Sequence, residues 1–421
     1  MSGVARRYYT LGMLTLVSTL NYLDRGLIGL LLQAIKGDLG LSDTQLGFLT
    51  GIAFGLFYAT LGLPIARWAD RGNRVTLTSV ALSLWAGTVM LCLFITNFVQ
   101  LVAARVAAAV GESGCMPPTY SLLGDYFPGP AERTRAMAIY MLASPLASLI
   151  SFGAGGWLNA LYGWRTTFFL MGIPALVVAL VVKMTINEPR ERGCRQQALG
   201  RDLPQLTSVF GILWNQRSSR HLIVALILLF TLGLGLQPWY GAFLVRSHGM
   251  NTVELGAWLG SIFGLGGVAG ILLGSYVSGR WLSGNEPGQM RLSAVIIATL
   301  FPCYVAFLLL PYKHYALAAL ALSGVVFNFF VGPVFALIQR LVADEIRATT
   351  LAVVMLLANL IGMGLGPQLV GVLSDLLMPA WGTDSLRYAM LVMCTLALWA
   401  AYHLWRAART VRVDLLEVAR R

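Results

Sequence analysis

Long apolar segments recur along the whole chain, and short polar segments separate them. Each apolar segment has about 20 residues or more, the length that an α-helix needs to cross a bilayer. Runs this long exclude a membrane β-barrel, because its strands are much shorter. The pattern predicts an all-α integral membrane protein with twelve transmembrane helices, near residues 8–35, 43–69, 75–96, 98–124, 134–161, 164–186, 221–246, 253–279, 292–311, 314–339, 348–374 and 386–405.

The longest polar stretch, residues 187–220, separates the first six predicted helices from the last six. It predicts a cytoplasmic linker between an N-terminal six-helix bundle, residues 1–186, and a C-terminal bundle with a short cytoplasmic tail, residues 221–421. A weak repeat supports this division, since residues 132–136 resemble residues 344–348. Internal repeats in a transporter predict a substrate site near the bilayer midplane, with access alternating between the two sides.

Composition and charge agree with a membrane protein. The chain is 57% hydrophobic and 11% charged, whereas a soluble domain carries about 25% charged residues. With the N-terminus in the cytoplasm, only five of the 30 Lys and Arg residues fall in external segments: Lys36, Arg165, Arg246, Lys313 and Arg387. The positive-inside rule therefore predicts that both termini are cytoplasmic, in a bacterial inner (plasma) membrane. The net charge of +12 is then explained by anionic lipid headgroups, so no nucleic acid partner is expected.

Four charges interrupt the apolar segments, Asp24 and Arg25 in the first helix and Arg105 and Glu112 in the fourth. A charge inside the bilayer costs at least ~2.5 kcal/mol, so it marks a candidate functional site. Arg105 and Glu112 are seven residues apart and therefore share a helix face, about 10.5 Å apart along the axis. Asp24 and Arg25 diverge by roughly 100°. The geometry predicts that Asp24 pairs with Arg105 and Arg25 with Glu112.

Two carboxylates and two arginines in low-dielectric surroundings form a possible proton switch, because a change in their spacing alters how tightly a carboxyl group holds a proton. The alternative is a static network that fixes the first helix to the fourth. Buried ion pairs often add little stability compared with apolar residues, which favours the switch. Asp24 is the favoured proton carrier, with Glu112 next.

A third charged stretch follows the second helix, where residues 66–74 read ARWADRGNR. This stretch resembles the loop signature of the major facilitator superfamily: Asp70, Arg71 and Arg74 match it, while Ala66 and Asn73 replace two glycines. The form of the signature in this chain is similar to that of the Spinster family of lipid transporters, and residues 21–25, 105–112 and 125–127 resemble the same family. The resemblance is strongest over residues 21–165 and weak after residue 190.

The resemblance implies the major facilitator fold and a role for each charged group. It implies that Asp24, Arg25, Arg105 and Glu112 form a proton-coupling network, and that Asp70, Arg71 and Arg74 form a cytoplasmic gate. In the superfamily such a carboxylate holds the two halves together on the cytoplasmic side, and the N-terminus of another helix is a suitable partner. The alternative is a basic anchor at the membrane surface, but an anchor would not need Asp70.

The second half has no acid or base deep in its helices. It offers aromatic and amide side chains instead, and the candidates for a substrate cavity are Trp239, Tyr240, Asn328, Phe330 and Asn359. A cavity with a charged wall and an apolar wall suits an amphipathic substrate with an anionic or zwitterionic head. Ordinary helix packing is the alternative for these residues.

The expected function is proton-coupled secondary transport of a lysophospholipid or sphingoid lipid. The alternative substrates are a polar metabolite, a drug or an organic anion. No phosphate-binding loop of the form GxxxxGK[ST] occurs, so ATP drive within this chain is not expected. A membrane-embedded lipid enzyme would need converging catalytic groups, which the sequence lacks, and a non-transporting receptor would bind without flux. The five cysteines show no metal-ligand spacing, and we expect a monomer without metal or cofactor, embedded among membrane lipids.

Overall fold

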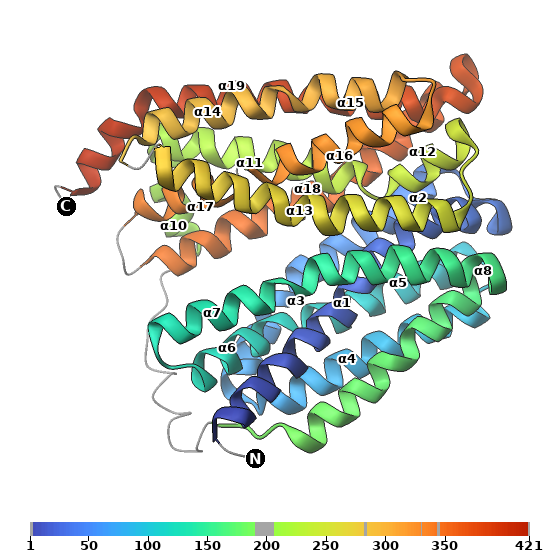
Figure 1. The fold of residues 1–421 in the computed structure, drawn as a ribbon, viewed down its shortest axis with the longest axis horizontal. Helices are drawn as coiled ribbons and strands as arrows, with labels where there is room; N and C mark the ends of the chain where they lie inside the picture. Colours follow the sequence, from blue (N-terminus) through green and yellow to red (C-terminus); the bar gives the residue numbers. More distant parts are fainter. Residues whose placement is uncertain (1–2, 190–205, 282–283, 330, 343–345, 420–421) are drawn as a thin grey trace. The chain divides into compact units, whose positions relative to one another are not determined.

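The computed structural model describes residues 3–189, 206–281, 284–329, 331–342 and 346–419. Within these ranges the regular structure is helical throughout and contains no strand. The helices form two compact units (Figure 1). The first contains the described residues of Met1–Leu41, Ile52–Asp202 and Met250–Gly260, and the second those of Ser42–Gly51, Leu203–Gly249 and Ser261–Arg421. The predicted division by sequence order stays a prediction; the compact units differ from it by two short segments, 42–51 and 250–260.

In the first unit, helix α8 packs against α1 and α4, and α5 packs against α3 and α4. Its helices are α1 (Gly3–Leu39), α3 (Ile52–Arg71), α4 (Arg74–Leu91), α5 (Phe98–Ser113), α6 (Met116–Tyr126), α7 (Pro130–Met141) and α8 (Ala143–Thr185). Asparagines begin two of them: Asn73 accepts from the backbone N–H of Thr76 at the start of α4, and Asn97 from that of Gln100 at the start of α5. Such N-caps satisfy backbone donors that the first helical turn leaves unpaired.

In the second unit, α11 packs against α18 and α19, and α14 packs against α19. Its helices are α2 (Asp43–Thr50), α10 (Leu206–Asn215), α11 (Arg217–Leu236), α12 (Trp239–His248), α13 (Thr252–Trp281, from Ser261 on), α14 (Glu286–Ala298), α15 (Leu300–Leu309), α16 (Lys313–Phe329), α17 (Val331–Arg340), α18 (Arg347–Trp381) and α19 (Ser385–Ala419). Helix α10 lies inside the predicted polar linker, while residues 190–205 of that linker lie outside the described residues.

The described residues contain nine helical stretches that are long and apolar enough to cross a membrane. Two of them, Ala131–Thr185 with 55 residues and Thr349–Glu417 with 69, are about 80 and 100 Å long at ~1.5 Å per residue. Each is therefore long enough to cross a ~30 Å core twice, and each is interrupted by a glycine with positive φ, Gly163 (76°) and Gly382 (52°). Helix α1, which carries Asp24 and Arg25, is not among the nine. Dividing the two long stretches and adding α1 accounts for the twelve predicted spans.

Close contact between α4 and α5 depends on Gly111. A Cβ atom at this position would lie 2.6 Å from the backbone nitrogen of Trp85 and 2.9 Å from the carbonyl oxygen of Ala81. Both atoms belong to the backbone of α4, so the two helices would have to separate. The glycine therefore sets the spacing at which α5 presents Arg105 and Glu112.

Gly111→Ala is expected to destabilise the protein by about 1–3 kcal/mol, the usual cost of overpacking. Gly87→Ala on α4 is the matched control, because a Cβ there meets no atom within 4 Å and alanine favours a helix. Thermal unfolding of both variants in detergent measures the difference. Equal unfolding temperatures for the two variants would contradict the proposed contact.

Candidate functional site

Asp24 and Arg105 form a buried ion pair in the first unit. The carboxylate comes from the middle of α1 and the guanidinium from α5, and Nη1 of Arg105 donates to Oδ2 of Asp24. Only 3% of Asp24 and 5% of Arg105 is exposed. The predicted pairing is confirmed, and it joins residues 81 positions apart in the sequence.

Arg25 and Glu112 form the second predicted pair. Nε of Arg25 donates to Oε1 of Glu112 at 2.7 Å, and Nη2 lies 2.5 Å from the same oxygen. Glu112 is fully buried, whereas 26% of the Arg25 side chain is exposed. Oε2 of Glu112 has no hydrogen-bond partner among the described residues. The two pairs therefore differ in burial: Asp24 and Arg105 are both buried, whereas part of the Arg25 side chain is exposed, although its Nη2 atom is buried.

Aromatic rings from α1 and α3 surround the Arg25 guanidinium. Its Cζ lies 5.1 Å from the ring centre of Tyr22, 5.7 Å from that of Phe54 and 4.8 Å from that of Tyr58. Phe54 also lies 4.4 Å from Cζ of Arg105, so one ring contacts both cations. Cation–π contacts of this kind contribute ~0.5–2 kcal/mol each, more when water is excluded. The rings thus help to hold two arginines in apolar surroundings.

Phe54 and Tyr58 were not among the predicted site residues, and Tyr22 was noted only as part of the stretch 21–25. Aromatic residues are frequent throughout the chain, and nothing in the sequence distinguishes Phe54 and Tyr58 from those that only pack. The one available signal is the spacing of four between Phe54 and Tyr58, which places both on one face of a helix. Their rings are indeed stacked, with centroids 5.5 Å apart.

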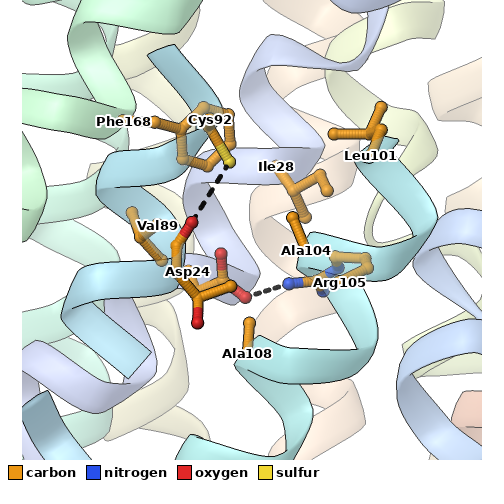
Figure 2. Close-up of a pocket in the computed structure, with 10 residues that line it drawn as sticks. Asp24, Ile28, Val89, Cys92, Leu101, Ala104, Arg105, Ala108 and Phe168 are labelled. Carbon is orange, nitrogen blue, oxygen red and sulfur yellow. Dashed lines mark hydrogen bonds and ion pairs between the residues drawn. The ribbon is translucent and has the colours of Figure 1, made fainter. Parts of the chain in front are cut away.

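A small cavity borders the Asp24–Arg105 pair (Figure 2). Its volume is about 10 Å³, at the lower limit of the space that one water molecule needs. Apart from the ion pair its lining is mainly apolar, with Val89 of α4 and Phe168 of α8 on one side and Ala104 and Ala108 of α5 on the other. Bulk water is therefore kept away from this carboxylate, which strengthens the electrostatic interaction with Arg105.

Asn21 lies one turn before Asp24 on α1 and is completely buried. Neither its amide oxygen nor its amide nitrogen has a hydrogen-bond partner among the described residues. A buried polar group without a partner is costly, so this amide is a suitable contact for a bound water next to the ion pairs. Asn21 begins the stretch 21–25 that resembles the Spinster family, but it was not among the predicted site residues.

The three predicted gate residues lie at the junction of α3 and α4. Asp70 and Arg71 end α3, and their side chains lie outside the described part of the structure. Arg74 begins α4 and is fully buried. It forms ion pairs with Glu188, which follows α8, and with Asp125 on α6, where Nη1 lies 2.6 Å from Oδ2. Arg74 thus ties the ends of three helices of the first unit together.

Two of the predicted substrate residues are buried in the second unit. Trp239 has no exposed surface, and its indole donates a hydrogen bond to the carbonyl oxygen of Pro367 at 3.2 Å. Tyr240 is 2% exposed, and its hydroxyl lies 3.2 Å from that of Tyr304. Both are held in packed surroundings in this structure, and their contact with a substrate stays a prediction.

The two predicted amides are partly exposed, and among the described residues each side chain donates a hydrogen bond within its own helix. Asn328 donates to the carbonyl oxygen of Gly324, and Asn359 to that of Met355, at 2.9 and 2.8 Å. Phe330 lies outside the described residues. Among the four predicted substrate residues that the structure describes, no hydrogen bond or ring contact joins one side chain to another.

A further charged cluster lies in the second unit, and sequence analysis missed it. Arg246 lies in the last turn of α12 and donates two hydrogen bonds of 2.7 Å to the carboxylate of Asp43. Asp43 is fully buried at the start of α2. Ser374 of α18 donates to the same carboxylate at 2.6 Å. The neighbouring Asp375 accepts from the backbone N–H groups of Asp43 and Thr44, at 3.1 and 2.7 Å, and so caps α2. Among the described residues no group of three or more His, Cys, Asp and Glu is arranged to hold a metal ion.

Comparisons with known proteins agree on one family. The family model described as Major Facilitator Superfamily matches residues 14–367. An MFS-type efflux pump of Mycolicibacterium smegmatis is 34% identical over 426 residues, covering 99% of this chain and 96% of that protein. Protein spinster homolog 1 of Xenopus laevis is 24% identical, and the match covers 85% of this chain and 71% of that protein. A probable galactarate/D-glucarate transporter of Bacillus subtilis is 26% identical over 70% of each chain.

Solved structures show the same relationship. The crystal structure of a bacterial homologue of the human lysosomal transporter Spinster, in an inward-facing and unoccupied conformation, matches with a TM-score of 0.85 and 27% identity. The match covers 97% of this chain and 98% of that one. A nucleoside transporter matches with a TM-score of 0.76 at 13% identity, which shows a common fold.

Proposed function

Because this chain belongs to the major facilitator superfamily as a Spinster-like membrane transporter, we propose that it is a proton-coupled secondary transporter which moves amphipathic, lipid-like substrates by alternating access. The relatives and the fold are those of transporters and not of enzymes. We further propose that the protein acts as a monomer in the bacterial inner membrane, with both termini in the cytoplasm and with protons, rather than a cofactor, as its coupling partner.

The observation that carries proton coupling is the pair of buried ion pairs between α1 and α5. Evolution of such pairs for stability alone is not expected, because apolar side chains of similar volume stabilise as well or better. When a transport step separates Asp24 from Arg105, the free carboxylate in this apolar site is stabilised by binding a proton. Closing the pair again releases the proton. The cycle couples a proton to the movement of α1 against α5.

Arg25 supports an anionic or zwitterionic head on the substrate. It is the one member of the four charges with a quarter of its side chain exposed, and its partner Glu112 is buried behind it. A carboxylate or phosphate that approaches Arg25 from the exposed side competes with Glu112 for the same guanidinium. The rings of Tyr22 and Tyr58 next to it offer apolar surface. This combination fits an amphiphile, and the resemblance of residues 21–25, 105–112 and 125–127 to the Spinster family of lipid transporters supports the proposal of a lysophospholipid or sphingoid lipid.

Export of drugs or organic anions is the second candidate. It is favoured by the relative named as an efflux pump, which is 34% identical over nearly the whole chain. The relatives named as sugar-acid transporters point to anionic substrates as well. These alternatives share the anionic group that Arg25 would bind and differ in the apolar part of the substrate.

Flux in proteoliposomes distinguishes the substrate classes. Labelled lysophospholipid, phosphorylated sphingoid base, glucarate and an anionic dye are tested with and without an imposed pH gradient. We expect gradient-dependent flux of the lysophospholipid or the phosphorylated sphingoid base and none of glucarate. Flux of the dye or of glucarate alone, with the same gradient dependence, would keep the proton coupling and overturn the lipid assignment.

The predicted gate at Asp70, Arg71 and Arg74 is a further part of the proposal. Asp70→Asn removes the charge that attracts a helix N-terminus and is expected to raise the share of molecules open toward the cytoplasm. Labelling of single cysteines introduced at the cytoplasmic and external ends of the helices measures this share. Lys36→Gln is the control for a lost surface charge, and an unchanged labelling pattern in Asp70→Asn would rule out the gate.

A further inference from the structure

An open groove runs between α4 and α8 on the first unit. Its volume is about 510 Å³, within the ~300–1,000 Å³ typical of small-molecule sites. The two helices run antiparallel here, since Thr76 on α4 contacts Lys183 on α8 while Leu84 and Leu176 line the groove further along. From Thr76 to Leu84 the groove extends for about 12 Å along α4, close to the ~15 Å thickness of half a bilayer core.

One end of the groove is polar and positively charged. Nζ of Lys183 donates a hydrogen bond of 2.5 Å to the hydroxyl of Thr76, and the residues Ser79 and Ser83 line the groove as well. These three α4 residues recur at spacings of three and four, which places them on one helix face. No acidic side chain is among the residues that line the groove. The polar end thus offers a cation and several hydroxyl groups without a competing carboxylate.

The Ser79 hydroxyl lacks a partner within the described protein. The residue is 94% buried, and its Oγ forms no hydrogen bond there. Serine and threonine in membrane helices usually bond back to the carbonyl four residues earlier. Thr78, its neighbour, does so to Arg74 at 2.8 Å, and Thr88 to Leu84. An unpartnered hydroxyl in apolar surroundings is costly, so Ser79 is prepared for an acceptor from outside the chain.

The remainder of the groove is apolar and exposed. Val80 and Leu84 of α4 and Leu176 and Leu180 of α8 line it, and all four are exposed. An acyl chain therefore finds an apolar path that begins directly beside the polar end. A polar, cationic end that continues into an apolar path has the layout of a phospholipid, with a phosphate at one end and acyl chains at the other.

We propose that this groove binds one anionic phospholipid of the surrounding membrane. Its phosphate contacts Lys183, Thr76 and Ser79, and an acyl chain lies along Leu84 and Leu176. Basic pockets between transmembrane helices bind anionic headgroups in this way. The site is separate from the candidate coupling site, although both involve the same helices: Val89 of α4 and Phe168 of α8 line the cavity beside Asp24.

The test measures stabilisation of the purified full-length protein by added lipid. Thermal unfolding in detergent is followed while phosphatidylglycerol or phosphatidylcholine is titrated, for the wild type, Lys183→Gln, Ser79→Ala and Arg135→Gln. Arg135 is the matched control, because it is an exposed basic residue of the first unit on α7, away from the groove. We expect phosphatidylglycerol to stabilise the wild type at lower concentration than phosphatidylcholine does. Lys183→Gln should weaken the effect of phosphatidylglycerol by about fivefold, and Ser79→Ala should weaken it to a smaller extent.

Three results would overturn the proposal. Equal effects of the two lipids would show that the groove does not select an anionic headgroup. An equal loss in Arg135→Gln would assign the effect to general surface charge. Stabilisation of the wild type by inorganic phosphate alone, lost in Lys183→Gln, would show an ion site without lipid. In the Asp24→Asn background, phosphatidylglycerol should still stabilise the protein, and Lys183→Gln should still weaken this stabilisation, because the groove site does not depend on proton coupling.

Discussion

Asp24→Asn is expected to abolish substrate accumulation driven by a pH gradient. A gradient of one pH unit supports about tenfold accumulation when one proton is coupled to each substrate molecule. Asparagine keeps the size and part of the hydrogen bonding of Asp24 but cannot take up and release a proton. In the variant, the ratio of the substrate concentrations on the two sides of the membrane should therefore stay at about one. Exchange of substrate between two sides at equal concentration should continue.

Asp38→Asn is the control for this measurement. Asp38 lies on the same helix and also pairs with an arginine, Arg165, but 41% of its side chain is exposed. Screening by water and salt makes such a surface pair contribute little, so accumulation should remain close to that of the wild type. Accumulation at the wild-type level in Asp24→Asn would exclude Asp24 as the proton carrier and direct attention to Glu112.

Arg105→Gln is expected to destabilise the protein by about 3–5 kcal/mol, because it leaves the buried carboxylate of Asp24 without its partner. The double variant Asp24→Asn/Arg105→Gln removes both charges and should recover most of this loss. Proton-driven accumulation should be absent in both variants. Thermal unfolding in detergent and flux in proteoliposomes, measured on the same preparations, separate the contribution to stability from the contribution to coupling.

The comparison of the wild type, Arg105→Gln and the double variant distinguishes an ion pair that couples protons to transport from one that is purely structural. If the pair serves only to fix α1 to α5, the double variant should regain transport together with stability. Recovery of stability without recovery of coupling is the expected outcome. If the wild type and Arg105→Gln are equally stable, Asp24 does not remain a buried, unpaired carboxylate when its partner is removed.

The central part of the site could be predicted because it follows from helix geometry alone. Charges are rare in the apolar segments, so Asp24, Arg25, Arg105 and Glu112 were few enough to pair by helix spacing. The aromatic rings around Arg25 could not be predicted, since Phe54 and Tyr58 resemble many other residues of the chain. Asn21 was missed because an amide in an apolar helix carries less information than a charge.

Contacts between residues far apart in the sequence also could not be predicted from the sequence. Arg246 looked like an external loop residue, and only the fold shows that it binds Asp43, 203 positions away. The length of the apolar segments predicted the twelve spans but not helix α10, which lies within the stretch that was predicted to be a polar linker. The burial of Trp239 also depends on packing partners such as Pro367, which no pattern in the sequence indicates.

The most direct test of the account is whether a substrate gradient drives protons. Proteoliposomes that contain a pH-sensitive dye are given a gradient of the transported substrate, with no initial pH difference. The account predicts a proton flux in the wild type that is absent in Asp24→Asn and retained in Asp38→Asn. Substrate flux in the wild type without any change of internal pH would contradict the account, because it would show transport that is not coupled to protons.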